Sequence, residues 1–267
     1  MMANIPKKVN DRFIKQTAKF QKVIKQAVDR DINETDTVKI IADILSDLFG
    51  YDRYTEITGE YAIKGTFCDL AIKVDDKTRY LIEVKAVSTD LKENHLRQAI
   101  NYGAREGIQW VILTNGLIWK GYSVSLKQSV TFEQVFELEF LGINPRKKED
   151  QQKLFLLAKE GLSKDVIADY HERLKCVNPY VISAILMSKP SIDLIKRELR
   201  KLSRGLKIED TEIESLLAND IFKRQVTEGE NSKIALKLIK KAANKSKKNT
   251  HYCPNVNRIK SAGCWEL

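Results

Sequence analysis

Two acidic residues and one lysine occupy two consecutive strands that the sequence predicts. Asp69 lies in the middle of a predicted strand over residues 66–74, and Glu83 and Lys85 share one face of the next, because side chains alternate along a strand. Most of their neighbours are apolar. Desolvating charges is costly unless they are paired or bind a metal, so we expect either an ion-pair network or a metal site here.

A third acid is predicted to point at the same sheet. The chain from Glu34 to Phe49 is typical of a helix, with a favourable N-cap at Asn33 and a favourable C-cap position at Gly50. Counting back by four along its apolar stripe leads to Glu34, so this carboxylate continues the buried face. A carboxylate at a helix N-terminus is also stabilised by about 0.3 to 1 kcal/mol, which explains Glu34 equally well.

Together these side chains favour a hard divalent cation. Three carboxylates and one ammonium sum to −2, and oxygen ligands suit Mg²⁺, with Mn²⁺ as the alternative. Such a centre could polarise a phosphodiester and lower the pKa of bound water, while Lys85 positions that water or stabilises the developing charge. The chemistry that we expect is hydrolysis of a phosphodiester.

The surrounding pattern predicts an α/β fold, with a mixed sheet flanked by helices and followed by a smaller all-helical domain. The four predicted segments are a basic N-terminal helix (1–30), a mixed-sheet domain (31–144), a helical domain (145–230) and a Lys-rich tail (231–267). Asn115-Gly116 is a strong hairpin signal in the second of these. We expect strands over 54–63, 66–74, 78–87, 110–114 and 117–124, a strand or short helix over 132–141, and helices over 11–30, 93–106, 149–160, 164–174, 179–187, 191–202 and 211–219, the last with a capping box of Thr211 and Glu214.

Charge is distributed unevenly along the 267 residues. Residues 1–144 hold 20 basic and 20 acidic side chains, so residues 145–267 carry the whole net charge of +10. From Asn231 to Lys260 there are nine basic residues and no acidic one, which suits either a phosphate backbone or a solubilising tail. We expect no membrane span and no secretory signal, and four scattered cysteines favour the cytoplasm.

The ordered motifs resemble the PD-(D/E)xK nucleases, and within them the N-terminal nuclease domain of type I restriction enzyme R subunits. This resemblance implies that the mixed sheet is restriction-endonuclease-like and that residues 31–144 form a nuclease-like domain. It further implies that Asp69, Glu83 and the backbone carbonyl of Val84 bind the metal, that Glu34 completes or supports the site, and that Lys85 is the catalytic lysine. The motifs are Asn33-Glu34-Thr35-Asp36-Thr37, Leu48-Phe49-Gly50-Tyr51-Asp52, Gly65-Thr66-Phe67-Cys68-Asp69, Leu81-Ile82-Glu83-Val84-Lys85-Ala86, Gln98-Ala99-Ile100-Asn101-Tyr102, and residues 110–116 with Trp119.

Gln98 and Tyr102 match the QxxxY motif of that branch. They lie four residues apart on one helical face. In the family this motif lies beside the site and contacts DNA or orients catalytic residues. The ordinary alternative is a helix that packs its tyrosine against the sheet.

The sequence departs from the family at two points. Cys68 replaces the signature proline, and no G-x-x-x-x-G-K-[ST] phosphate loop is present, so the ATP-driven motor of an R subunit is missing. We therefore expect a free-standing, Mg²⁺-dependent DNA endonuclease of restriction or phage defence, acting as a homodimer or with a partner that selects the substrate. Two alternatives stay open: a catalytically inactive nucleic-acid-binding or assembly subunit with the same fold, and a nuclease that cleaves RNA.

Some further residues offer weaker signals. His95 begins a predicted helix near the proposed site and reads more simply as an exposed side chain. Candidate soft metal ligands are His251, Cys253 and Cys264, and candidate base-stacking residues or core residues are Trp110, Trp119 and Tyr122.

Overall fold

The computed structural model describes residues 3–63, 66–126, 129–203 and 205–249. The chain divides into two compact units, residues 1–172 and residues 173–267. The two are described separately below.

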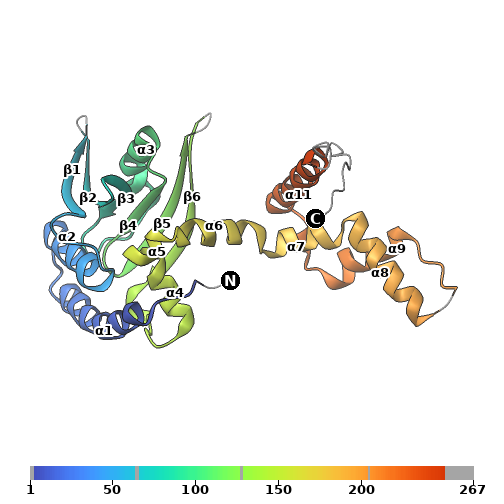
Figure 1. Ribbon diagram of the computed structural model, residues 1–267, viewed down its shortest axis with the longest axis horizontal. Coiled ribbons are helices and arrows are strands. Elements are labelled where there is room, and N and C mark those ends of the chain that lie inside the picture. The colour runs from blue at the N-terminus through green and yellow to red at the C-terminus, as the bar shows by residue number, and fades with distance from the viewer. Residues whose placement is uncertain (1–2, 64–65, 127–128, 204, 250–267) are drawn as a thin grey trace, which may run out of the picture. The chain divides into compact units, whose positions relative to one another are not determined.

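A six-stranded mixed sheet forms the centre of the first unit (Figure 1). The strands lie in their sequence order, and only the pairing of the third strand with the fourth is parallel. This confirms the α/β class and the mixed sheet. The strands are β1 (Ile57–Ile63), β2 (Thr66–Val74), β3 (Lys77–Val84), β4 (Trp110–Thr114), β5 (Ile118–Leu126) and β6 (Val130–Glu139).

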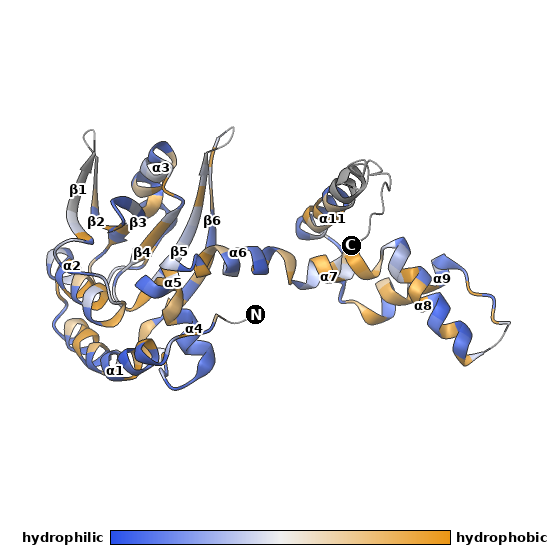
Figure 2. Ribbon diagram, viewed as in Figure 1, coloured by the Kyte–Doolittle hydropathy of each residue, from blue (hydrophilic) through white to orange (hydrophobic). Residues whose placement is uncertain are grey.

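Helices cover both faces of this sheet, and each face has its own apolar core. One core joins Phe13 and Ile41 to Tyr80 and Ile82 of β3, and the other joins Ile100 to Leu81, so alternation along β3 directs its side chains into both. All five residues of β4 are buried, and this central strand is apolar along most of its length (Figure 2). The helices are α1 (Lys7–Asp29), α2 (Glu34–Asp43) with a π-helical turn (Ile44–Leu48), α3 (Arg97–Glu106) after a 3-10 turn (Glu93–Leu96), α4 (Lys148–Leu157), α5 (Lys159–Ser163) and α6 (Val166–Cys176).

The first unit extends beyond the predicted range of 31–144. Helix α1 buries Phe13 and Phe20 in the first core, and α4 buries Leu154 and Phe155 there. The hydroxyl of Tyr80 also donates to the carbonyl of Leu156 (3.2 Å). The structure therefore places the N-terminal helix and α4 in one compact unit with the sheet, because their apolar stripes are buried only there.

The second unit consists of helices with two small cores. One is formed by Ile192, Ile208, Ile213 and Leu217, and the other by Val181, Ala184 and Ala235. Among the described helices, none combines the length and apolar character that a membrane span requires. The helices are α7 (Pro179–Leu186), α8 (Lys189–Leu202), α9 (Asp210–Leu216) with a π-helical turn (Leu217–Ile221), α10 (Arg224–Thr227) and α11 (Glu230–Asn249).

Two sequence expectations for the second unit differ from the structure. The Lys-rich segment is a helix, α11, as far as Asn249, and it contacts α7 through the core that contains Ala235. The capping box of Thr211 and Glu214 is wrong, because α9 begins one residue earlier, behind Glu209, which makes no side-chain cap hydrogen bond.

Arg12 fixes the end of the segment that carries Glu34 at its start. Its guanidinium donates to the carbonyls of Leu48 (2.9 Å) and Phe49 (3.3 Å) and makes a two-pronged ion pair with Glu160 at 2.9 and 2.7 Å. Gly50 turns the chain there with a φ of +85°, and a Cβ at this position would lie 2.6 Å from Arg12. Burial alone would raise the pKa of Glu160, but the hydrogen bonds from Arg12 lower it overall.

We expect Arg12→Met to lower the free energy of unfolding at pH 7 by about 2 to 3 kcal/mol, since charged hydrogen bonds are lost and Glu160 loses its partner. Because the folded pKa of Glu160 is depressed, its contribution is present above the ordinary value of 4.5 and disappears as the pH falls through the folded pKa. Urea unfolding at pH 7 and pH 3 measures both effects. Lys19→Met, which removes an exposed ion pair with Asp47, is the control and should cost at most about 1 kcal/mol. Equal losses in both variants would contradict this account.

Candidate active site

The two strands that carry the acids separate at the site. The β2–β3 ladder ends at the pair Leu70 and Ile82. Beyond that pair, the Oδ2 atom of Asp69 accepts the backbone N–H of Val84 at 2.7 Å. On the other side, the backbone N–H of Lys85 donates to the carbonyl of Thr114 at 2.9 Å, so β3 stays attached to β4. The Asp69 carboxylate thus takes the position of a ladder acceptor at the end of β3.

The ammonium group of Lys85 gathers the predicted site residues. Its Nζ donates to Oε1 of Glu83 (2.9 Å), to the backbone carbonyl of Val84 (2.9 Å) and to Oε2 of Glu34 (3.3 Å). The side chains of Lys85 and Glu83 are only 17% and 14% exposed, whereas that of Glu34 is 48% exposed. The structure therefore brings together Glu34, Asp69, Glu83, Lys85 and the Val84 carbonyl.

Helix α2 delivers Glu34 because its first turn is well defined. Oδ1 of Asn33 accepts the backbone N–H of Asp36 at 2.9 Å, as the predicted N-cap requires. Ile41, Leu45 and Leu48 are buried along the stripe. The carboxylate of Glu34 extends from the start of this helix to Lys85. Glu34 therefore lies both at a helix N-terminus and among the site residues, so its two sequence interpretations hold together.

Burial dominates the electrostatics of the two strand acids. It raises the pKa of Asp69 more than the Val84 hydrogen bond and the Lys85 charge lower it. Burial likewise raises the pKa of Glu83, against the hydrogen bond with Lys85. For Lys85, burial alone would lower the pKa, but the Glu83 hydrogen bond and the charges of Glu83, Asp69 and Glu34 raise it overall. The raised pKa keeps the ammonium of Lys85 charged at neutral pH, whereas burial disfavours the charged forms of the two acids.

The oxygen atoms at this site match the chemistry of a hard divalent cation. Two carboxylates and one backbone carbonyl already surround one positive charge, and Mg²⁺ takes such oxygen ligands. Within the described ranges, no group of three Asp, Glu, His or Cys side chains is itself arranged to hold a metal. The oxygen atoms are of the type that Mg²⁺ prefers, and the ammonium of Lys85 lies between those of Glu34, Glu83 and Val84.

The QxxxY pair lies on α3, the helix of the second core. Tyr102 is buried in that core with Cys68 and Leu81, whereas Gln98, one turn earlier, is exposed. Gly103 lets the chain after α3 fold closely back on the helix, because a Cβ there would lie 2.9 Å from the carbonyl of Ile108. For Tyr102 the structure matches the ordinary alternative of a tyrosine packed against the sheet.

The three aromatic residues of the central hairpin belong to the cores. Trp119 is fully buried, with its ring edge-on to Phe49 at 5.6 Å. Trp110 packs against His171, and the buried Tyr122 donates its hydroxyl to Gln134 at 3.2 Å. Of the two alternatives for Trp110, Trp119 and Tyr122, the structure therefore matches core packing and not base stacking.

The two remaining candidates are His95 and the set of soft ligands near the end of the sequence. Nδ1 of His95 accepts the backbone N–H of Lys92 at 3.3 Å, which is a local cap of a 3-10 turn. The candidate soft ligands His251, Cys253 and Cys264 lie outside the described residues.

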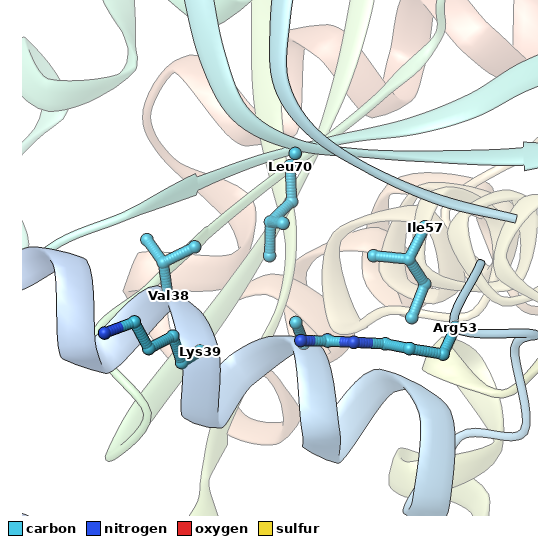
Figure 3. A pocket seen from close by; sticks show the side chains of 7 residues that line it. Val38, Lys39, Arg53, Ile57 and Leu70 are labelled. Atoms are coloured by element: carbon cyan, nitrogen blue, oxygen red, sulfur yellow. The ribbon is translucent and has the colours of Figure 1, made fainter.

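A hollow that sequence reasoning missed lies between α2 and the β1–β2 edge (Figure 3). Its volume is about 240 Å³, and Val38 of α2 and Leu70 of β2 lie in its wall. Nη1 of Arg53 is buried there without a hydrogen-bond partner, and its Nη2 lies 3.6 Å from Oδ1 of Asp43. No sequence pattern singles out Arg53, which lies in a turn. The lining residues are Val38, Lys39, Ala42, Arg53, Ile57, Gly59 and Leu70.

Residues 36–138 match the family model described as the N terminus of the type I restriction enzyme R protein. The matched segment contains Asp69, Glu83, Lys85 and the QxxxY pair, and it begins two residues after Glu34. No curated protein and no solved structure matches the chain. The resemblance to the N-terminal domain of type I R subunits is thus confirmed over fewer than half of the 267 residues, and it is consistent with a restriction-type nuclease domain.

We expect Asp69→Asn to stabilise the fold at pH 7, because the amide oxygen can still accept the Val84 N–H without the cost of a desolvated charge. The folded pKa of Asp69 is raised, so its charge destabilises the fold above that pKa and not below the ordinary value of 3.8. The Asn variant should therefore show a higher urea midpoint at pH 7 in EDTA and lose this advantage near pH 3. Asp47→Asn, at the exposed partner of Lys19, is the control and should gain nothing. A lower midpoint for the Asp69 variant at pH 7 would refute the expected burial cost.

Proposed function

We propose that this protein is a Mg²⁺-dependent endonuclease that hydrolyses phosphodiester bonds of DNA. The observation that carries this proposal is the meeting of Glu34, Asp69, Glu83 and Lys85 at the end of β3, inside a unit whose sheet matches the type I R protein N terminus. Mn²⁺ is the alternative ion.

Each site residue has a role in this proposal. Asp69, Glu83 and the Val84 carbonyl would hold the ion, and Glu34 would support it. The ion would polarise the phosphodiester and lower the pKa of bound water. Lys85 would stabilise the negative charge that develops on the phosphoryl oxygens as water attacks phosphorus and the P–O bond to the leaving group breaks.

Two surfaces of the chain suit a polyanion. The hollow between α2 and the β1–β2 edge carries Arg53 and Lys39, whose positive charges suit a phosphate of the DNA backbone. In the second unit, α11 exposes Lys237, Lys240 and Lys241, which make no ion pair with any described residue. Lysines in such a row bind the backbone without reading sequence.

The biological setting belongs to the proposal as well. A restriction-type domain fits cytoplasmic restriction or phage defence, in which a partner protein or a second copy of the chain would select the substrate. A homodimer would supply two sites for the two DNA strands.

Cleavage tests the proposed chemistry. With Mg²⁺ and plasmid DNA, we expect Asp69→Asn, Glu83→Gln and Lys85→Ala each to lower the nicking rate by about a hundredfold or more, and EDTA to abolish it. Lys19→Met, an exposed position on α1, should retain the rate of the unaltered chain. Equal nicking by all variants would mean a contaminating nuclease. DNA binding without nicking would support the inactive subunit, and a labelled RNA assayed in parallel tests the third alternative.

DNA binding tests α11. Changing Lys237, Lys240 and Lys241 together to Gln should weaken DNA binding and reduce the slope of log affinity against log salt by about 2 to 3. The matched control changes Lys19, Lys153 and Lys201 to Gln, which removes the same charge from lysines already paired with acids. Fluorescence anisotropy with a labelled duplex measures both slopes. Equal slope changes in the two triple variants would remove α11 from the DNA contact.

A further inference from the structure

The oxygen atoms that hold the Lys85 ammonium are largely those proposed to hold the metal. Glu83, the Val84 carbonyl and Glu34 each accept a hydrogen bond from Nζ. The fourth proposed ligand, Asp69, is held by Val84 as well, because its carboxylate accepts the Val84 backbone N–H. One ammonium therefore binds three of the four groups at once.

Movement of the Lys85 ammonium away from these oxygens would leave buried negative charge unless another cation replaced it. Its side chain is 17% exposed and that of Glu83 is 14% exposed, so both groups are largely removed from water. With Lys85 in place the three acids and the lysine sum to −2, and without it they sum to −3. A buried acid that loses its cation is strongly destabilised, so the ammonium and a divalent ion are alternative partners for the same oxygens.

We propose that Lys85 is a built-in competitor of the metal: a divalent ion binds only by displacing the ammonium from Glu83, Val84 and Glu34. This inference rests on the proposed function. Displacement costs part of the binding energy of the ion, and it frees Lys85 to face the phosphate of a substrate. Metal affinity is thus set by Lys85 as well as by the acids.

Direct metal binding tests this role without reference to activity. Mn²⁺ is titrated into the full chain by calorimetry after EDTA treatment, and melting temperatures are measured with and without Mn²⁺. Lys85→Met should bind Mn²⁺ at least about tenfold more tightly than the unaltered chain, because a repelling charge next to the ion is gone. It should also melt lower without Mn²⁺ and be stabilised more by it.

Three variants make the result specific. Lys85→Arg keeps the charge and should keep weak binding. Lys120→Met removes an equally buried lysine, 21% exposed and paired with Glu137, and should change the affinity by less than about threefold. Glu83→Gln removes a shared ligand and should abolish the tight binding when combined with Lys85→Met. Cooperative melting of each variant shows that it is folded.

The outcomes separate the two proposals. Tighter binding in Lys85→Met alone supports the competitor role. If the unaltered chain binds Mn²⁺ and folded Lys85→Met binds it equally or more weakly, the competitor role is overturned and the proposed metal site stands. If neither folded protein binds Mn²⁺, the proposed metal site fails and the competitor role fails with it.

Discussion

The positive charge of Lys85 is what allows three acidic side chains to lie close together at one end of the sheet. Burial raises the pKa of both Asp69 and Glu83, so each of these acids is held in its charged form at a cost. The ammonium offsets that cost through two carboxylates and one backbone carbonyl. Groups of this kind are not expected in a fold selected for stability alone, since apolar residues of similar volume do as well or better.

The rest of the first unit holds the two sides of this interaction in place. The parallel pair β3–β4 fixes the backbone of Lys85 through Thr114, and the separation of β2 from β3 frees the Val84 N–H for Asp69. Glu34 reaches the site from α2, on a helical segment whose far end is held by Arg12. The site therefore depends on how the helical layer of α1 and α2 packs on the sheet, which makes its geometry sensitive to contacts far from it.

Local patterns in the sequence were enough to predict the approximate positions of the strands and the grouping of charged side chains at the end of β3. Alternation gave β2 and β4 with their observed bounds, and it placed Glu83 and Lys85 on one side of β3. The helical period with the Asn33 cap aimed Glu34 at the sheet. These features depend on neighbours within a few residues, so a single sequence contains them.

Features that depend on distant packing could not be predicted in this way. Nothing in residues 148–157 indicates that Phe155 is buried with Phe13 of α1, because an apolar stripe does not name its partner. From its residue type, Trp119 could either stack on a base or fill a core. The packing of Phe49 against its ring shows that it belongs to the core. Arg53 lies in a turn, where no periodic pattern applies, and only the fold shows that its Nη1 is buried in the hollow between α2 and the β1–β2 edge.

The two proposed roles of charge fall in different units. The acids around Lys85 lie in the first unit, whereas Lys237, Lys240 and Lys241 of α11, which are exposed and make no ion pair with any described residue, lie in the second. Ions in solution screen charges that face water and act weakly on pairs as buried as Glu83 and Lys85. Salt would therefore weaken the hold on a phosphate backbone while leaving the charged cluster at β3 nearly unchanged. Under the proposed function, DNA binding by α11 would therefore depend strongly on salt, whereas the charged cluster at β3 would depend on it weakly. A change in salt or in the α11 lysines would then alter DNA affinity without altering the cluster.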